Sequence, residues 1–206
     1  MKTIEEKIYS RICRNGAGWV FSNKDFSEIA GSATIDVSLY RLLKAGKIRK
    51  VCHGIYDYPK YSEFLKQTLS PDLDLTAKAI ARKLGWRIQP EGNTALNLLG
   101  LSNQVPGRIV YLSDGPDRCR SYKIGKQILE IRNIAKKEIG FKHFESGLLV
   151  QALRALGRNH VTDDIIEKIR DAFPAKTRNR IIADTSYVTG WIREIIIQIC
   201  QKAKNE

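Results

Sequence analysis

The sequence predicts an α+β protein, in which a small helical domain with a hairpin precedes a larger mixed domain that ends in helices. Three observations predict this class: helical spacing of apolar residues at both ends of the chain, short alternating strands that meet at glycines, and glycines or prolines between the periodic segments. A chain of 206 residues can hold one large domain or two small ones, and 43% hydrophobic residues suffice to fill a core.

The net charge predicts a polyanionic partner. The 35 Lys and Arg residues outnumber 22 Asp and Glu, which gives a formal charge of +13 and a pI near 9.7. A basic surface attracts phosphates and releases counterions when it binds them. No stretch approaches the roughly 20 apolar residues of a membrane span, and the acidic, amphipathic start is unlike a secretory signal. We therefore expect a cytoplasmic protein with no membrane partner.

The cysteines and histidines predict neither a metal site nor a cofactor. The four cysteines lie far apart without the C-x-x-C spacing of zinc sites, and the three histidines are equally isolated. The sequence contains no nucleophile motif and no glycine-rich phosphate loop, so we expect no catalytic residues and no enzymatic activity. Cys13 and Cys200 fall in apolar helical patterns, where we expect them to be buried.

Two helices and a short strand are predicted first. Ile4, Ile8 and Ile12 share one stripe, which predicts a helix over residues 3–13. Residues 19–21 are typical of a very short strand. Ser22 can then cap a second helix, whose apolar face ends before Gly31.

A third helix and a basic hairpin complete the first domain. The helix begins with Ser32 or Thr34 as its cap and ends at Gly46, and residues 35, 39, 42 and 43 form its inner face. Residues 48–52 and 55–58 then flank a His-Gly turn, which predicts a two-stranded ribbon. This order of elements is typical of a winged helix-turn-helix, and we assign it to residues 1–68.

The winged helix predicts double-stranded DNA as a partner, because a helix fits the major groove while a wing follows the backbone. The candidate contacts lie on the third helix and on the hairpin that follows it: Thr34, Ser38, Tyr40, Arg41, Lys44, Lys47, Arg49, Lys50 and His53. Asp36, on the groove-facing side, counts against this interpretation, although a carboxylate can accept a hydrogen bond from a cytosine amino group. Two alternatives stay open: each basic residue is a solvated surface charge, or the module docks proteins.

Residues 69–206 predict a mixed α/β C-terminal domain with a helical end. We expect five helices, over residues 74–84, 94–101, 144–156, the stretch after Thr162, and 187–203. We also expect a strand over residues 109–112 and a hairpin made of residues 119–124 and 127–134. The hairpin offers a possible second basic surface, made of Arg118, Arg120, Lys123 and Lys126.

Residues 32–59 resemble the N-terminal module of AbiE-type antitoxins. In that family a helix ending in Leu-x-x-Leu-x-x-x-Gly-x-Ile leads into a basic strand and a Gly-x-Tyr, and the matching residues here are Leu39, Leu42, Gly46, Ile48, Arg49, Gly54 and Tyr56. Residues 94–118 are similar to the helix, loop and strand that open the family's second domain.

The resemblance implies a function in a type IV toxin–antitoxin system that provides phage defence by abortive infection. It implies a DNA-binding transcriptional autorepressor of its own promoter, and an antitoxin whose second domain counteracts a nucleotidyltransferase-like toxin. The alternatives are a ligand-responsive winged-helix regulator without a toxin, which predicts an apolar pocket in the second domain, a nucleic-acid enzyme, or a protein-interaction module.

Overall fold

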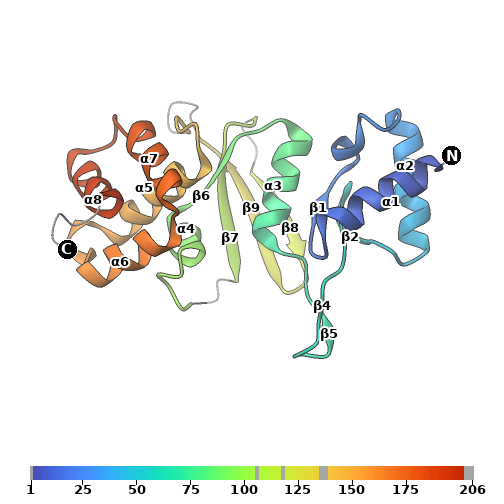
Figure 1. Ribbon diagram of the computed structural model, residues 1–206, viewed down its shortest axis with the longest axis horizontal. Coiled ribbons are helices and arrows are strands. Elements are labelled where there is room, and N and C mark those ends of the chain that lie inside the picture. Colours follow the sequence, from blue (N-terminus) through green and yellow to red (C-terminus); the bar gives the residue numbers. More distant parts are fainter. Residues whose placement is uncertain (1, 105–106, 117–118, 135–138, 202–206) are drawn as a thin grey trace. The chain divides into compact units, whose positions relative to one another are not determined.

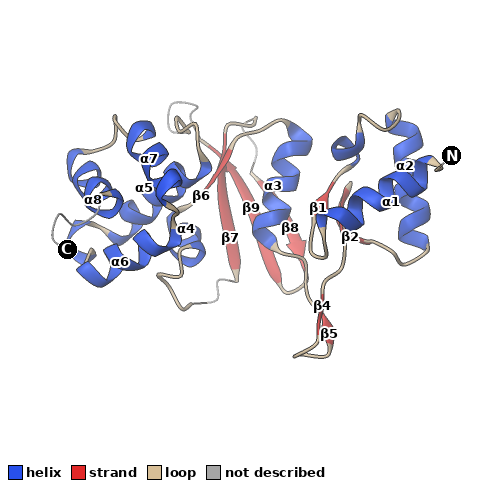
Figure 2. Cartoon of the chain, in the orientation of Figure 1, coloured by secondary structure: helices blue, strands red, loops and turns tan. Residues whose placement is uncertain are grey.

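The computed structural model of the chain describes residues 2–104, 107–116, 119–134 and 139–201 (Figure 1). Helices and strands both contribute substantially (Figure 2), so the predicted α+β class is confirmed. The contacts divide the chain into two compact units, residues 1–86 with 120–130, and residues 87–119 with 131–206. The first unit is therefore larger than the segment 1–68 assigned to the winged helix, and that assignment stays a prediction.

Helix α1 (Ile4–Asn15) opens the first unit and has a reciprocal cap. The Glu6 N–H donates to the Thr3 hydroxyl at 3.2 Å, and the Thr3 N–H donates to the Glu6 carboxylate at 2.8 Å. This arrangement satisfies two backbone donors that a helix start otherwise leaves unpaired. Ile8 and Ile12 are fully buried, as their spacing predicts, whereas Cys13 is exposed. The expectation that Cys13 is buried was wrong, since it lies on the solvent side of α1.

Strand β1 (Val20–Phe21) is followed by a single 3-10 turn, η1 (Asn23–Phe26), where the sequence predicted a full helix. The Ser22 N–H donates to the Asp25 carboxylate at 2.8 Å, which closes the turn locally. The rest of the segment before Gly31 forms turns, so the expectation of an α-helix after Ser22 was wrong.

Helix α2 (Ser32–Lys44) is the predicted third helix, and Ile35, Leu39 and Leu42 on its inner face are buried. Gly31 occupies the N-cap position without a side-chain bond. The expectation that Ser32 or Thr34 caps the helix was wrong, because both residues already lie within it. Together α1, η1 and α2 enclose the core of the first unit, to which Phe21 and Phe26 contribute an edge-to-face pair with centroids 5.5 Å apart.

Strands β1, β3 (Ile55–Asp57) and β2 (Arg49–Cys52) form a three-stranded antiparallel sheet in that order. The hairpin between β2 and β3 is the ribbon that the sequence predicts, and its turn residue Gly54 has a φ of +66°. Helix, strand, 3-10 turn, helix and hairpin follow one another in an order compatible with a winged helix-turn-helix.

A second hairpin, β4 (Tyr61–Ser62) with β5 (Gln67–Thr68), is absent from the sequence prediction. It exposes an apolar tip, where Phe64 is 93% exposed. Its strands have two residues each, too few for an alternating pattern to mark them.

Helix α3 (Leu73–Leu84) belongs to the first unit. Asp72 caps it by accepting the Leu75 N–H at 2.8 Å. From the last turn, Arg82 donates to the Asp25 carboxylate and to the Val20 carbonyl, both at 3.0 Å. These bonds fasten α3 to β1 and η1 and explain why the compact unit extends past residue 68.

A four-stranded sheet follows, in the order β6 (Ile88–Pro90), β7 (Arg108–Ser113), β9 (Gln127–Asn133) and β8 (Arg120–Ile124). The predicted strand at 109–112 and the predicted hairpin at 119–134 correspond to β7 and to β8 with β9. Strand β6 was not predicted, because its proline and three-residue length hide it. The division between the two units falls within β9.

The helices of the second unit gather into one cluster (Figure 1). They are α4 (Gly92–Leu98), α5 (Phe144–Leu156), α6 (Asp163–Ala172), α7 (Ala175–Asp184) and α8 (Gly190–Cys200), with a 3-10 turn, η3 (Arg158–His160). Cys200 is buried as expected. The predicted helix at 187–203 begins only after Thr189, which occupies its N-cap, and α7 forms where the sequence indicated only a basic segment after Pro174.

Two carboxylates of the second unit have structural partners. The Asp114 carboxylate accepts from the Arg87 N–H at 2.7 Å and from the Arg87 guanidinium at 2.9 Å. Asp184 accepts the N–H groups of Lys142 and His143 just before α5, both at 3.0 Å. Burial opposes ionisation in each case, but these hydrogen bonds outweigh it and hold the pKa of Asp114 and the pKa of Asp184 below the usual value.

Candidate nucleic-acid interface

The outer face of α2 gathers four of the predicted DNA contacts. Thr34, Tyr40, Arg41 and Lys44 are all exposed, opposite the buried Ile35. This helix buries residues at helical spacing, so the intervening positions necessarily share its solvent side. The face therefore presents two cations, a hydroxyl and an aromatic ring on one rigid element.

Aromatic rings organise the lysines at the end of this face. The Lys44 ammonium lies 5.6 Å from the centroid of the Tyr40 ring, and the Lys47 ammonium lies 4.7 Å from that of Tyr9. A cation over a ring is attracted to it without losing its charge. Both lysines are exposed, so their ammonium groups can reach a phosphate.

Arg41 lies beside an acidic neighbour. A guanidinium nitrogen of Arg41 is 3.9 Å from a carboxylate oxygen of Glu5, and the Arg41 side chain is 67% exposed. Both line a groove of about 710 Å³ between the first turn of α1 and the outer face of α2, which Glu6 and Lys47 also line. A long, exposed pair of this kind is weak, and Arg41 can exchange Glu5 for a phosphate.

Ser38 does not belong to this face. It is 5% exposed, and its hydroxyl donates to the Thr34 carbonyl at 2.9 Å. Residue 38 lies one turn beyond Thr34 but on the side that faces the core. The hydroxyl that we expect to bond to DNA is thus engaged within the helix, although Ser38 also lines the groove beside Arg41, and its DNA contact stays a prediction.

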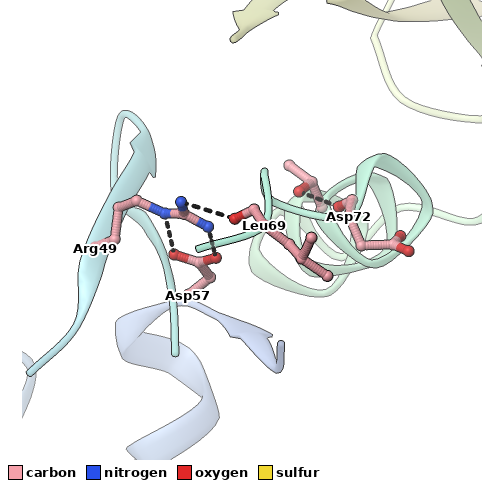
Figure 3. Close-up of polar contacts among 5 residues, drawn as sticks. Arg49, Asp57, Leu69 and Asp72 are labelled. Carbon is pink, nitrogen blue, oxygen red and sulfur yellow. Dashed lines mark hydrogen bonds and ion pairs between the residues drawn. The ribbon is translucent and has the colours of Figure 1, made fainter. Parts of the chain in front are cut away.

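Arg49 is engaged within the protein (Figure 3). Its guanidinium donates twice to the Asp57 carboxylate, at 3.0 and 2.5 Å, and once to the Leu69 carbonyl at 3.0 Å. The Asp57 side chain is 2% exposed, so it requires this partner. We had expected Arg49 to follow the phosphates, but its position on the inner side of β2 commits it to the fold.

The rest of the hairpin is only partly available. Lys50 and His53 are exposed, as a wing requires. However, the Lys83 ammonium of α3 donates to the His53 carbonyl at 3.3 Å. A Cβ atom on Gly54 would lie 2.1 Å from the same ammonium nitrogen. Helix α3 therefore packs against the turn of the wing.

The second basic surface is divided. Arg118 lies outside the described residues. The Arg120 guanidinium lies 4.8 Å from the centroid of the Trp86 ring. Lys123 and Lys126 are exposed. Strand β8 alternates sides, so Arg120 and Lys123 face opposite ways.

Helix α3 supplies functional candidates that the sequence prediction missed. Lys83 and Arg82 belong to a helix that we assigned to the second domain, yet both contact the winged module. The signal available was their position in the last turn of a helix with an apolar face. Nothing in the sequence indicates which earlier segment that turn touches.

Neither a metal site nor a membrane-spanning helix appears in the part of the chain that the structure describes. Within it, no three or more His, Cys, Asp or Glu side chains gather closely enough to hold a metal ion. No described helix is long and apolar enough to cross a membrane.

Comparison with known proteins places the chain in a family. Residues 4–181 match the model of DUF6088, a family of unknown function. This match covers most of both units, and the chain belongs to that family. A search of curated proteins found no match.

Proposed function

For this member of a family of unknown function, we propose a non-enzymatic, cytoplasmic DNA-binding protein that represses its own promoter and acts as an antitoxin. The outer face of α2 is the observation that carries the DNA proposal. It combines exposed Arg41 and Lys44 with exposed Thr34 and Tyr40 on a rigid helix. Such a helix can enter the major groove, with cations on phosphates and hydroxyls near the bases.

The net charge of +13 supports the same proposal. Cations that neutralise phosphates release counterions, so affinity falls with salt. Lys47 and Lys50 are exposed at the base of the wing and on its outer side, and we propose that they contact the backbone beside the helix. We leave Arg49 and Ser38 out of the proposed interface, because both side chains have partners within the protein.

The antitoxin proposal is supported by the AbiE-type pattern from Leu39 to Tyr56. In the structure, these residues form the end of α2 and the β2–β3 hairpin. We propose that the second unit opposes a nucleotidyltransferase-like toxin. Co-expression with the product of a neighbouring gene of that type tests this proposal: restored growth supports it, and continued toxicity contradicts it.

A duplex-binding measurement tests the DNA proposal. Fluorescence anisotropy of the full chain with its own upstream DNA and with a scrambled duplex, at two salt concentrations, gives affinity and salt slope. Arg41→Ala with Lys44→Ala is expected to weaken binding about tenfold to a hundredfold and to reduce the salt slope by about two. Lys176→Ala with Arg180→Ala removes the same charge from exposed positions of α7 and should have a smaller effect. Equal effects would contradict the assignment of α2.

A regulator that responds to a small ligand is the second candidate, favoured by one pocket. It has a volume of about 460 Å³ and is lined by Trp19, Leu75 and the Arg49–Asp57 pair, among others. This size suits a small organic molecule. The pocket lies in the first unit, whereas the sequence reasoning expected one in the second. This candidate would be favoured if a metabolite mixture raises the melting temperature of the unmodified chain but not that of the Trp19→Ala variant.

A further inference from the structure

A small pocket lies at the turn of the wing, inside the first unit. Its volume is about 240 Å³, and it is lined by the hairpin turn, by the last turn of α3 and by β8. Pockets for drug-sized ligands measure about 300–1,000 Å³, so this one suits a smaller group. The α2 face proposed for DNA makes no use of it.

The polar lining of the pocket consists of two cations, an imidazole and a phenol. His53 comes from the wing turn, Lys83 from α3, and Arg120 and Tyr122 from β8. No Asp or Glu of the described residues lines the pocket. Two cations and an imidazole from three separate elements therefore converge in a pocket that no described carboxylate lines.

The donors of the two permanent cations are only partly used. Lys83 donates one hydrogen bond, to the His53 carbonyl at 3.3 Å, and an ammonium has three N–H groups. The Arg120 guanidinium carbon lies over the Trp86 ring, 4.8 Å from the ring centroid. A guanidinium has five N–H groups, and a contact with one ring does not use them all. The remaining N–H groups can bind an anion.

The walls strengthen this preference. Ile55, Ile80 and Leu84 complete the lining, and apolar walls lower the local dielectric and strengthen attraction to an anion. Burial raises the pKa of the neighbouring Cys52 thiol, although Lys83 and Lys50 oppose that shift. Arg and Lys donors in such surroundings match the oxygens of a phosphoryl group.

We propose that this pocket binds a phosphoryl group and thereby joins the wing turn to α3 and β8. The group belongs either to the backbone of bound DNA or to a small phosphorylated molecule. The binding chemistry is the same in both cases, and only the first source rests on the proposed DNA function.

Inorganic phosphate is the first probe. We expect phosphate to raise the melting temperature of the full chain above that in chloride at equal ionic strength, because a ligand of the folded state stabilises it. Lys83→Gln and Arg120→Gln should each reduce this shift by more than half. Lys123→Gln is the matched control, since Lys123 is on β8 but on the exposed side, and it should retain the shift.

A charge-neutral pair of variants guards against effects of net charge and of misfolding. Gly54→Ala displaces the Lys83 ammonium, which would lie 2.1 Å from the new Cβ atom. Gly46→Ala is the control: Gly46 has a φ of +67°, close to the +66° of Gly54, but no neighbour within 4 Å. We expect phosphate binding to be weakened in Gly54→Ala and retained in Gly46→Ala.

Duplex DNA is the second probe. One outcome is that Lys83→Gln weakens duplex binding and reduces the salt slope by about one, while Lys123→Gln does neither. If this occurs and phosphate alone has no effect, the DNA backbone supplies the phosphoryl group. If phosphate still raises the melting temperature of the Arg41→Ala, Lys44→Ala variant, the pocket binds phosphate whether or not the protein binds DNA through α2. If Lys83→Gln and Lys123→Gln behave alike with both probes, the proposal is overturned.

Discussion

Helix α2 and the β2–β3 hairpin carry similar basic side chains, but their neighbours leave these side chains in different states. On α2, Arg41 and Lys44 are exposed, and their contacts to Glu5 and Tyr40 are long and replaceable. On the hairpin, Arg49 is bound to Asp57 and Leu69, and the turn packs against Lys83. The first region is free to bind a ligand, whereas much of the second already serves the fold.

This difference has a geometric origin. A helix that buries one stripe leaves a broad opposite face in solvent, so its cations stay available. A strand sends alternate side chains to opposite sides, so adjacent basic residues on β2 meet unlike surroundings. Charge and order along the chain alone therefore overestimate the wing and describe the helix well.

The largest expected effect on stability comes from comparing alanine substitutions at two adjacent residues of β2. Arg49→Ala leaves the buried Asp57 carboxylate unpaired and should lower the free energy of unfolding by about 3 kcal/mol. Lys50→Ala removes an exposed charge and should change it by less than about 0.5 kcal/mol. Urea unfolding followed by tryptophan fluorescence measures both values. Similar values for the two variants would mean that the whole hairpin is a free wing.

The second unit offers the same test with two glycines that each begin a helix. A Cβ atom on Gly92, at the start of α4, would lie 2.7 Å from the Ala155 Cβ of α5, while one on Gly190, at the start of α8, would meet nothing within 4 Å. Gly92→Ala should destabilise the protein by about 2 kcal/mol through overpacking. Gly190→Ala should be neutral or stabilise it by up to about 1 kcal/mol.

Thermal and urea unfolding measure the free energy of unfolding of the two glycine variants. Equal stabilities would show that the close approach of α4 and α5 relaxes without cost. That result would weaken the general rule drawn here, that surroundings rather than residue type set the effect of a substitution.

Periodicity predicted most of the elements that were long enough to repeat their pattern, although the ten-residue helix α7 was interpreted only as a basic segment. The helices α1, α2, α3 and α5, and the strands β7, β8 and β9, all follow from the spacing of their apolar residues. Strands of two or three residues, such as β4, β5 and β6, contain too few positions for any period to appear. The helix expected after Ser22 was reduced to η1, where the Asp25 carboxylate accepts the Ser22 N–H and closes a 3-10 turn.

The candidate site was predicted only to the extent that it depends on local spacing. The exposed face of α2 follows from its buried face, with Ser38 the exception at the border between the two. Arg49 is held by hydrogen bonds to Asp57 and Leu69, and Lys83 from α3 donates to the turn of the wing. These contacts join segments distant in sequence, and only the tertiary structure brings them together.

A smaller effect is expected from acid. The bonds from Lys142 and His143 hold the pKa of Asp184 below its usual value, despite opposing burial. Asp184 therefore stabilises the fold fully above its unfolded pKa of about 3.9, and this contribution is lost as pH falls through the lower folded pKa. Asp184→Asn should cost about 1 kcal/mol near neutral pH. The difference from the unmodified chain should shrink below about pH 4.

The control for this pH dependence is Asp171→Asn, since Asp171 is exposed on α6. Urea unfolding between about pH 3 and pH 7 should give a nearly constant difference for Asp171→Asn and a falling one for Asp184→Asn. A constant difference for both variants would mean that Asp184 does not hold the N–H groups of Lys142 and His143 as an anion.

The smallest expected effect separates two hydroxyls one turn apart on α2. The exposed Thr34 can bond to DNA, whereas the Ser38 hydroxyl already donates to the Thr34 carbonyl at 2.9 Å. Thr34→Ala should weaken duplex binding about threefold, the value of one modest hydrogen bond. Ser38→Ala should leave duplex affinity unchanged. A loss of duplex affinity with Ser38→Ala but not with Thr34→Ala would mean that α2 rotates on binding and exposes Ser38. The residues buried in the free protein would then not identify the face that binds DNA.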